Sequence, residues 1–168
     1  PLYAHYLAQT GLDHPARDEV IADGETDWRK VVGALTGAAP GDAPVWYQKH
    51  MTHHLLPGRS TAWVNGLVNV FLIRDPAEVV ESYLKSRATV APPDIGLLQQ
   101  AELFDQVAQQ LGEAPPVIDA DDFLRAPGPY LQALCARLGL PFTERMLHWI
   151  YEAGGLLPRI AREFLRAR

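Results

Sequence analysis

The sequence predicts an α/β fold in which a parallel sheet carries helices on both faces. Three short apolar runs with strand character, at residues 45–49, 68–73 and 116–119, alternate with segments of helical periodicity. The run Val68–Ile73 is partly β-branched and too short for a helix, so we expect a strand buried on both faces. The length of 168 residues fits one domain, and we expect residues 1–168 to form it.

The part of the chain before this central strand is expected to be mostly helical. Thr26 and Asp27 are residue types that cap helices, and they precede a helical pattern. The expected elements are, in order, a helix at 1–10, a loop with a brief helical turn at 11–23, a helix at 28–35, a linker at 36–44, a strand at 45–49, a turn at 58–61 and a short helix at 63–67.

The part after the central strand alternates again between helices and one strand. Gly112 and Gly139 stand where helical patterns end, as expected of C-terminal caps. The expected elements are a helix beginning at 76, a loop at 88–94, a helix at 95–111, a strand at 116–119, a turn at 121–128, and helices at 129–138, 143–151 and 156–168.

The junction after the central strand is the first candidate site. Arg74 ends the strand, and Asp75 and Pro76 form a helix start with Asp at the N-cap and Pro at the first helical position. Ser82 lies two turns further on, on the polar side of the helix. An arginine and a hydroxyl at the carboxyl end of a strand suit an anion such as phosphate. The alternative is a capped connection in which Arg74 pairs with a nearby carboxylate.

A lysine and three histidines follow the strand expected at 45–49 and form the second candidate site. Lys49 can neutralise an anion, and His50, His53 or His54 can act as a general base near neutral pH. A metal site is the alternative, because His50 stands three and four residues before His53 and His54. No Cys or carboxylate stands close in sequence to complete it, so we expect no metal. The other histidines, His5, His14 and His148, are isolated and are interpreted as structural or exposed.

Composition narrows the class of protein. Apolar residues make up 48% and charged residues 21%, with a net charge of −5, which argues against general nucleic-acid binding. There is no apolar run long enough to cross a membrane and no signal peptide, so we expect no membrane association. The one cysteine, Cys135, fits a helical apolar pattern and a reducing, cytoplasmic setting.

Several stretches resemble sulfotransferases that use 3′-phosphoadenosine-5′-phosphosulfate (PAPS). VFLIRDPAEVVESYLKSR (residues 70–87) is similar to their 3′-phosphate motif, an arginine at a strand end with a serine eight residues later. YQKHMTHHLLP (47–57) is similar to the segment with the catalytic lysine and histidine. VIDADDFLRAPGPYLQALCARLGLPF (117–142) and PLYAHYL (1–7) resemble further segments, the last one in bacterial sulfotransferase-like proteins. The resemblance covers roughly residues 1–149.

The resemblance implies a three-layer α/β/α fold like that of P-loop nucleotide hydrolases, and sulfuryl transfer to a hydroxyl or amine of a small molecule. It implies that Arg74 and Ser82, with Arg87 as a further contact, hold the 3′-phosphate of PAPS. It also implies that Lys49 stabilises the leaving group and that His53 or His54 takes the acceptor proton. We favour His53, because a sharp turn after Lys49 would bring it back to the strand end.

The chain also departs from this family. The loop that binds the 5′-phosphosulfate is expected before Pro1, and the Arg-Lys-Gly cofactor segment is not visible near the carboxyl end. Residues 150–168 do not match the family. Two alternatives therefore stay open: a non-catalytic nucleotide-binding or interaction module of the same fold, and a P-loop small-molecule kinase, although no Walker lysine or magnesium-binding carboxylate is visible.

Overall fold

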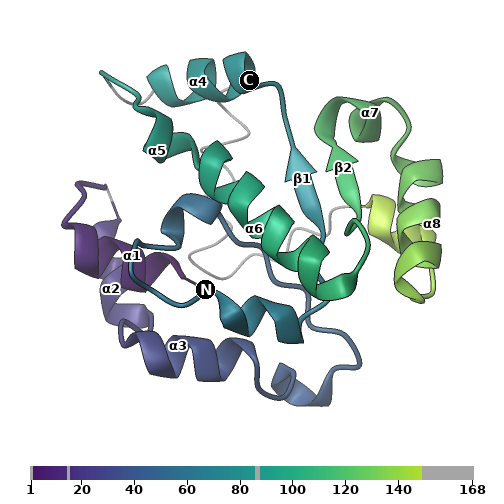
Figure 1. The fold of residues 1–168 in the computed structure, drawn as a ribbon, viewed down its shortest axis with the longest axis horizontal. Helices are drawn as coiled ribbons and strands as arrows, with labels where there is room; N and C mark the ends of the chain where they lie inside the picture. The colour runs from purple at the N-terminus through teal and green to yellow at the C-terminus, as the bar shows by residue number, and fades with distance from the viewer. Residues whose placement is uncertain (1, 15, 86–87, 149–168) are drawn as a thin grey trace. The chain divides into compact units, whose positions relative to one another are not determined.

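The computed structural model describes residues 2–14, 16–85 and 88–148, which form a mixed, helix-rich fold with a small parallel sheet (Figure 1). The chain divides into two compact units, residues 1–120 and 121–168. The candidate site residues lie in the first unit. The combination of many helices with a small parallel sheet is compatible with the predicted α/β class.

Three helices open the first unit: α1 (Tyr3–Thr10), α2 (Arg17–Asp23) and α3 (Trp28–Leu35). Helices α1 and α3 confirm the sequence prediction, whereas α2 is longer than the brief turn that was expected. The Asp27 carboxylate accepts a hydrogen bond from the Lys30 backbone N–H at 3.0 Å and so caps α3. One apolar cluster, centred on Leu2, Val31 and Leu35, fixes α3 to the beginning of the chain.

The strand predicted at residues 45–49 does not form. These residues belong to no helix or strand, and the Gln48 side-chain amide donates to the Leu35 carbonyl oxygen at 2.9 Å. Trp46 contacts the first apolar cluster, while the side chain of Tyr47 is 83% exposed. Exposed and partly buried side chains thus alternate along residues 45–49, as in a strand. A strand also needs a neighbouring backbone, and this segment has no ladder partner among the described residues. Short 3₁₀ helices follow, η2 (Thr52–His54) and η3 (Ala62–Gly66).

The sheet consists of β1 (Phe71–Ile73) and β2 (Val117–Asp119), paired in parallel with Phe71 opposite Val117. Helix α6 (Leu97–Leu111) covers one face of it (Figure 1). The rings of Phe71 and Phe104 meet edge to face at 5.3 Å, and Gln100 Nε2 donates to the Leu72 carbonyl oxygen at 2.8 Å.

The central strand is shorter than predicted and is not buried on both faces. Phe71 is buried, but Leu72, whose side chain projects to the opposite face, is 50% exposed. The described residues therefore cover that face only in part, and an apolar run by itself does not tell how many layers surround it. Helix α4 (Pro76–Leu84) follows β1 as predicted, and α5 (Pro92–Ile95) forms within the expected loop.

The second unit contains α7 (Ala120–Arg125), α8 (Pro127–Leu138) and η4 (Glu144–Leu147). Helix α7 replaces the predicted turn, and an ion pair of 2.6 Å between Arg125 and Asp122 joins two of its turns. Cys135 is buried in α8, as predicted, with its Sγ 3.8 Å from Met146 Sδ. The helix predicted at 156–168 and the end of the one predicted at 143–151 lie outside the described residues.

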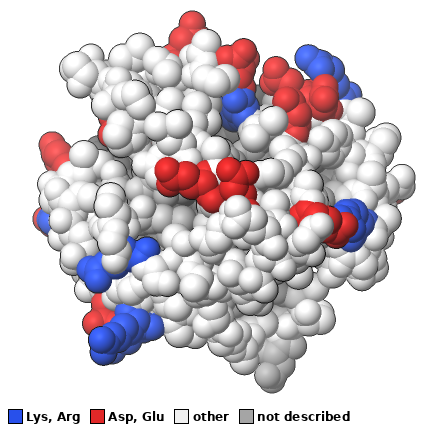
Figure 2. Space-filling view, viewed as in Figure 1, with Lys and Arg blue, Asp and Glu red and all other residues white. Residues whose placement is uncertain are grey.

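The described surface carries mixed charge. On the face shown in Figure 2, Lys and Arg side chains lie in small separate groups next to Asp and Glu side chains. No helix in the described part of the chain combines the length and the apolar character needed to span a membrane.

Candidate functional site

The strand–arginine–helix junction forms as the sequence predicts. Arg74 directly follows β1 and is exposed. The Asp75 carboxylate accepts a hydrogen bond from the Ala77 backbone N–H at 2.7 Å, and Pro76 occupies the first helical position of α4. This cap fixes the start of α4 directly after Arg74. The side chain that the sequence assigns to an anion is thus held at the positive end of a helix dipole.

In the structure the arginine pairs with a carboxylate. Arg74 Nη2 lies 3.2 Å from Glu78 Oε2, and both side chains are more than 40% exposed. Ser82 is exposed and lies one further turn along α4, on the same side as Glu78. An exposed pair with this i, i+4 spacing contributes only about 0.3–0.5 kcal/mol. Arg74 can therefore exchange Glu78 for a better anion at little cost.

His54 lies in an aromatic slot formed by α1. Its ring stacks on Tyr3 with centroids 4.9 Å apart, and the ring of Tyr6 lies at 4.6 Å. Burial, with a smaller contribution from the neighbouring His53, lowers the pKa of His54 to about 3. His54 is therefore neutral at physiological pH and serves to fix this segment against α1.

His53 connects the histidine segment to α4. Its ring meets that of Tyr83 edge to face, with centroids 6.3 Å apart, and that of Tyr6 at 5.7 Å. Tyr83 follows Ser82 directly in α4. The fold thus brings His53 next to the helix that carries Ser82, although the two residues are far apart in sequence.

Gly96 allows this segment to approach the start of α6. The Thr52 hydroxyl donates to the Gly96 carbonyl oxygen at 2.8 Å. A Cβ on Gly96 would lie only 2.6 Å from Thr52 Oγ1 and 2.8 Å from the backbone nitrogen of His53, and the φ of Gly96 is +67°. A glycine at this position is therefore a condition for the placement of His53.

Lys49 and His50 are placed less favourably for a joint role with His53. Lys49 is exposed on the segment of residues 45–49 and forms no ion pair with another described residue. His50 Nε2 lies 3.1 Å from Gln48 Oε1, the ring meets Trp63, and burial lowers the pKa of His50 to about 4. Arg87 lies outside the described residues.

The histidine segment does not complete a metal site in the described part of the chain, where no group of three or more His, Cys, Asp or Glu residues has the geometry to hold an ion.

Sequence reasoning anticipated one contact of the site and missed others. The structure shows the alternative in which Arg74 pairs with a nearby carboxylate, and the i, i+4 spacing would have identified Glu78 as that carboxylate. The tyrosines around His53 and His54 come from distant segments, so no pattern of neighbouring residues in the sequence predicts these contacts. These tyrosines are Tyr3, Tyr6 and Tyr83.

Comparison with known proteins now gives the family. The chain is 35% identical over 152 residues to the branched-chain-amino-acid aminotransferase-like protein 1 of Arabidopsis thaliana, a match that covers 89% of this chain and 26% of that protein. The chain is also 33% identical over 154 residues to the branched-chain-amino-acid aminotransferase-like protein 2 of Arabidopsis thaliana. This match covers 92% of the chain and 27% of that protein. The chain therefore spans about a quarter of the length of these relatives. No solved structure matches the chain. The model of the sulfotransferase domain matches residues 1–158, and the chain belongs to the sulfotransferase domain family.

Proposed function

We propose that this chain takes part in the transfer of a sulfuryl group from PAPS to a hydroxyl or amine of a small-molecule acceptor. The observation that carries the proposal is the junction of β1 and α4, where Arg74 follows the strand and Ser82 lies on the capped helix. Membership of the sulfotransferase domain family supports sulfuryl transfer in general. PAPS is the donor that this family generally uses, and the two-stranded parallel sheet is compatible with a P-loop-like α/β/α fold.

In this proposal Arg74 and Ser82 hold the 3′-phosphate of PAPS, with Arg87 as a further contact. Arg74 leaves Glu78 and donates to phosphate oxygens, while the Ser82 hydroxyl donates from the same side of α4. A phosphate dianion is a better partner for a guanidinium than one carboxylate, because it offers more charge and more acceptor oxygens.

The reacting end is assigned to the histidine segment. The acceptor oxygen attacks the sulfur, the bond between sulfur and the bridging oxygen of the 5′-phosphate breaks, and the acceptor proton passes to His53. Lys49 stabilises the negative charge that develops on the bridging oxygen, which requires its flexible side chain to turn inward from its exposed position. His54 is the weaker candidate for the base, because a group with a pKa near 3 accepts a proton poorly at neutral pH.

Calorimetry with 3′-phosphoadenosine-5′-phosphate tests the binding half of the proposal. Arg74→Ala is expected to weaken binding roughly 10- to 100-fold, since a charge-assisted hydrogen bond contributes about 1.5–3 kcal/mol. Arg125→Ala, which removes an arginine from the second unit, is the control. Unchanged affinity in Arg74→Ala would refute the assigned role.

Turnover assays with PAPS test the catalytic half. His53→Ala is expected to abolish sulfuryl transfer and to leave the affinity for 3′-phosphoadenosine-5′-phosphate near that of the unchanged protein. If His54→Phe abolishes transfer and His53→Ala does not, the assignment of the base is wrong.

A non-catalytic nucleotide-binding module is the second candidate, and the exposure of Lys49 on an irregular segment favours it. The matched relatives carry an aminotransferase-like name, but the chain covers only a quarter of each, so that name supports no transamination by this chain. Binding of the nucleotide that depends on Arg74, without transfer from PAPS to any acceptor, would favour the module.

A further inference from the structure

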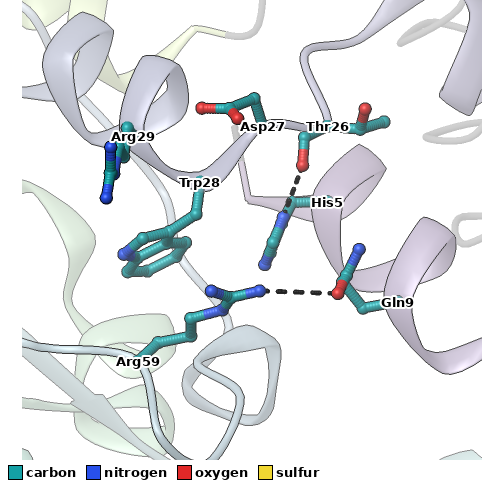
Figure 3. Close-up of a pocket in the computed structure, with 7 residues that line it drawn as sticks. All are labelled: His5, Gln9, Thr26, Asp27, Trp28, Arg29 and Arg59. Carbon is teal, nitrogen blue, oxygen red and sulfur yellow. Dashed lines mark hydrogen bonds between the residues drawn. The ribbon is translucent and has the colours of Figure 1, made fainter.

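A polar hollow of about 290 Å³ lies beside α1 and the start of α3 (Figure 3). It contains none of the residues assigned above to sulfuryl transfer. Its walls are formed by His5, Gln9, Thr26, Asp27, Trp28, Arg29 and Arg59. From the sequence, His5 is expected to be structural or exposed, and in the structure it is buried and bonded to a backbone carbonyl group.

His5 is 1% exposed, and its hydrogen bonding defines which ring nitrogen carries the proton. Nδ1 lies 2.6 Å from the carbonyl oxygen of Thr26. A carbonyl oxygen only accepts, so Nδ1 is the donor, and in the neutral ring Nε2 keeps its lone pair. Nε2 is buried and has no hydrogen-bond partner among the described residues. Buried polar atoms are rarely left unpaired, so this nitrogen calls for a ligand that donates a hydrogen bond.

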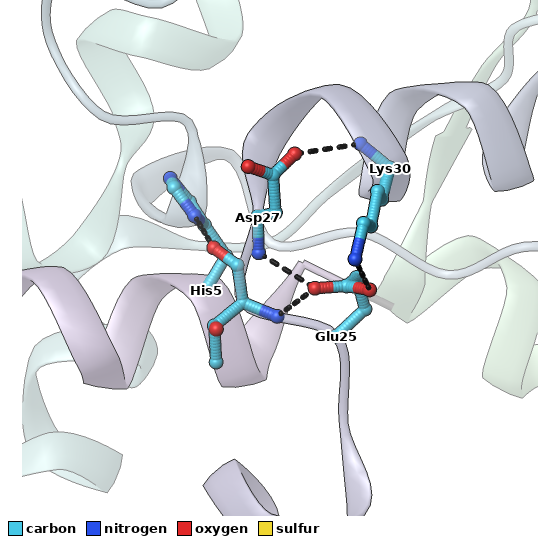
Figure 4. Close-up of polar contacts among 5 residues, drawn as sticks. His5, Glu25, Asp27 and Lys30 are labelled. Atoms are coloured by element: carbon cyan, nitrogen blue, oxygen red, sulfur yellow. Dashed lines mark hydrogen bonds and ion pairs between the residues drawn. The ribbon is translucent and has the colours of Figure 1, made fainter.

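The carbonyl group that orients His5 is itself held firmly (Figure 4). Glu25 Oε1 accepts from the backbone N–H groups of Thr26 and Asp27 at 2.9 and 2.8 Å, and Glu25 Oε2 pairs with Lys30 at 3.8 Å. A Cβ on Gly24 would collide with the Cβ of Ala4, so this turn lies directly against α1. The tautomer of His5 is therefore set by the fold before any ligand arrives.

The remaining walls supply positive charge. The Arg59 side chain lines the same hollow as His5 (Figure 3), and its Nη2 donates to Gln9 Oε1 across a long 3.4 Å. Arg29 also lines the hollow, whereas the carboxylate of Asp27 is engaged as the cap of α3. Two guanidinium groups against one engaged carboxylate favour an anion.

We propose that this hollow binds a small anion that also carries an O–H group, such as hydrogenphosphate or a hydroxycarboxylate. The O–H donates to His5 Nε2, and the anionic oxygens accept from Arg59 and Arg29. Sulfate and acetate have the charge but no proton to donate, so they leave Nε2 unpaired against their own oxygen lone pairs. The lone pair of His5 therefore sets specificity, and the arginines set affinity.

The test is calorimetric titration at pH 8 of the whole chain, without any sulfuryl donor, with phosphate, glycolate, sulfate and acetate. Phosphate or glycolate is expected to bind at least about tenfold more tightly than sulfate and acetate, the cost of facing a buried acceptor with another acceptor. Comparing phosphate with glycolate shows whether the O–H group of a hydrogenphosphate or that of a hydroxycarboxylate is preferred. Equal affinity for sulfate and phosphate, or no binding of any of the four at millimolar concentration, would overturn the proposal.

Variants of His5 and Arg59 separate the effect of the lone pair on specificity from the effect of charge on affinity. His5→Asn keeps an amide group near the position of Nδ1, able to donate to the Thr26 carbonyl, but lacks Nε2, so the preference for phosphate over sulfate is expected to vanish. Arg59→Gln is expected to weaken both anions about tenfold while the preference remains, and Arg125→Gln, which changes an exposed arginine of the second unit, serves as its control.

Long-range ¹H–¹⁵N NMR of His5 gives a readout that does not depend on affinity. Without ligand, the ¹⁵N chemical shift of Nε2 is expected to be that of an unprotonated ring nitrogen. Phosphate should change this chemical shift, whereas sulfate should not. A protonated Nε2 and an unprotonated Nδ1 in the free protein would contradict the proposal directly.

Discussion

Glu78 is expected to act as a competitor for the phosphate-binding arginine, so Glu78→Gln should tighten the binding of 3′-phosphoadenosine-5′-phosphate. The ligand must break the pair of 3.2 Å between Glu78 and Arg74, which contributes about 0.3–0.5 kcal/mol because both side chains are exposed. A phosphate bound to Arg74 then lies roughly 5 Å from the Glu78 carboxylate, which costs about 0.8 kcal/mol per unit charge in water.

For a phosphate dianion the repulsion doubles, so the two contributions add to about 2 kcal/mol, which corresponds to a roughly thirtyfold lower Kd for Glu78→Gln at low salt. Calorimetry at low salt measures this change, and the gain should shrink as added salt screens the repulsion. Glu81→Gln is the matched control, because Glu81 is an exposed carboxylate on the same helix. An unchanged or weaker affinity in Glu78→Gln, or the same gain in Glu81→Gln, would refute the reasoning.

Three further predictions concern stability and are measured by urea denaturation. Because the pKa values of His54 and His50 are lowered to about 3 and about 4 in the folded state, the unfolded chain binds more protons, and the free energy of unfolding should fall as pH decreases from about 6.5 toward 4. His54 contributes up to about 1.4 kcal/mol per pH unit, and the more exposed His50 contributes less because solvent screens its charge; His54→Phe should therefore reduce the slope, and an unchanged slope would contradict this account. Gly96→Ala should lower the free energy of unfolding by more than the roughly 1–2 kcal/mol that a positive φ costs, since the new Cβ collides with Thr52. Gly112→Ala, at φ +73° with nothing within 4 Å of the new Cβ, should cost only the backbone strain, and equal losses for the two variants would contradict the close approach at Gly96. Phe71→Ala should cost about 3–5 kcal/mol because Phe71 is 6% exposed, and the adjacent Leu72→Ala, at 50% exposed, should cost clearly less; the reverse order would mean that β1 faces the other way.

The sequence alone predicted the features that depend on neighbours within a few residues. The cap at Asp75, the helix that follows it, the cap of α3 at Asp27 and the end of α6 at Gly112 all formed as expected. A cap is decided by one side chain and the backbone N–H groups two or three residues away, so its pattern is present in the linear sequence. The spacing of Arg74 and Ser82 is likewise present in the linear sequence, because both belong to the same strand–helix junction.

Features that depend on distant partners were not predictable in this way. Residues 45–49 have the composition of a strand, yet whether they join a sheet depends on which backbone lies beside them, and they lie along α3 instead. The expectation of two covered faces for β1 was wrong for the same reason, because an apolar run does not reveal how many elements pack on it.

The histidines show the division most clearly. From the sequence, His53 was preferred to His54 only because of an expected turn after Lys49. The tertiary structure separated the two by stacking His54 on α1 and bringing His53 next to α4. The sequence offered no reason to select His5. Its buried lone pair exists because a carbonyl oxygen 21 residues away fixes the opposite nitrogen. Local sequence thus determined caps, helix order and the arginine–serine spacing. Long-range packing decided which side chains share an environment, and hence which charge and which tautomer each histidine carries.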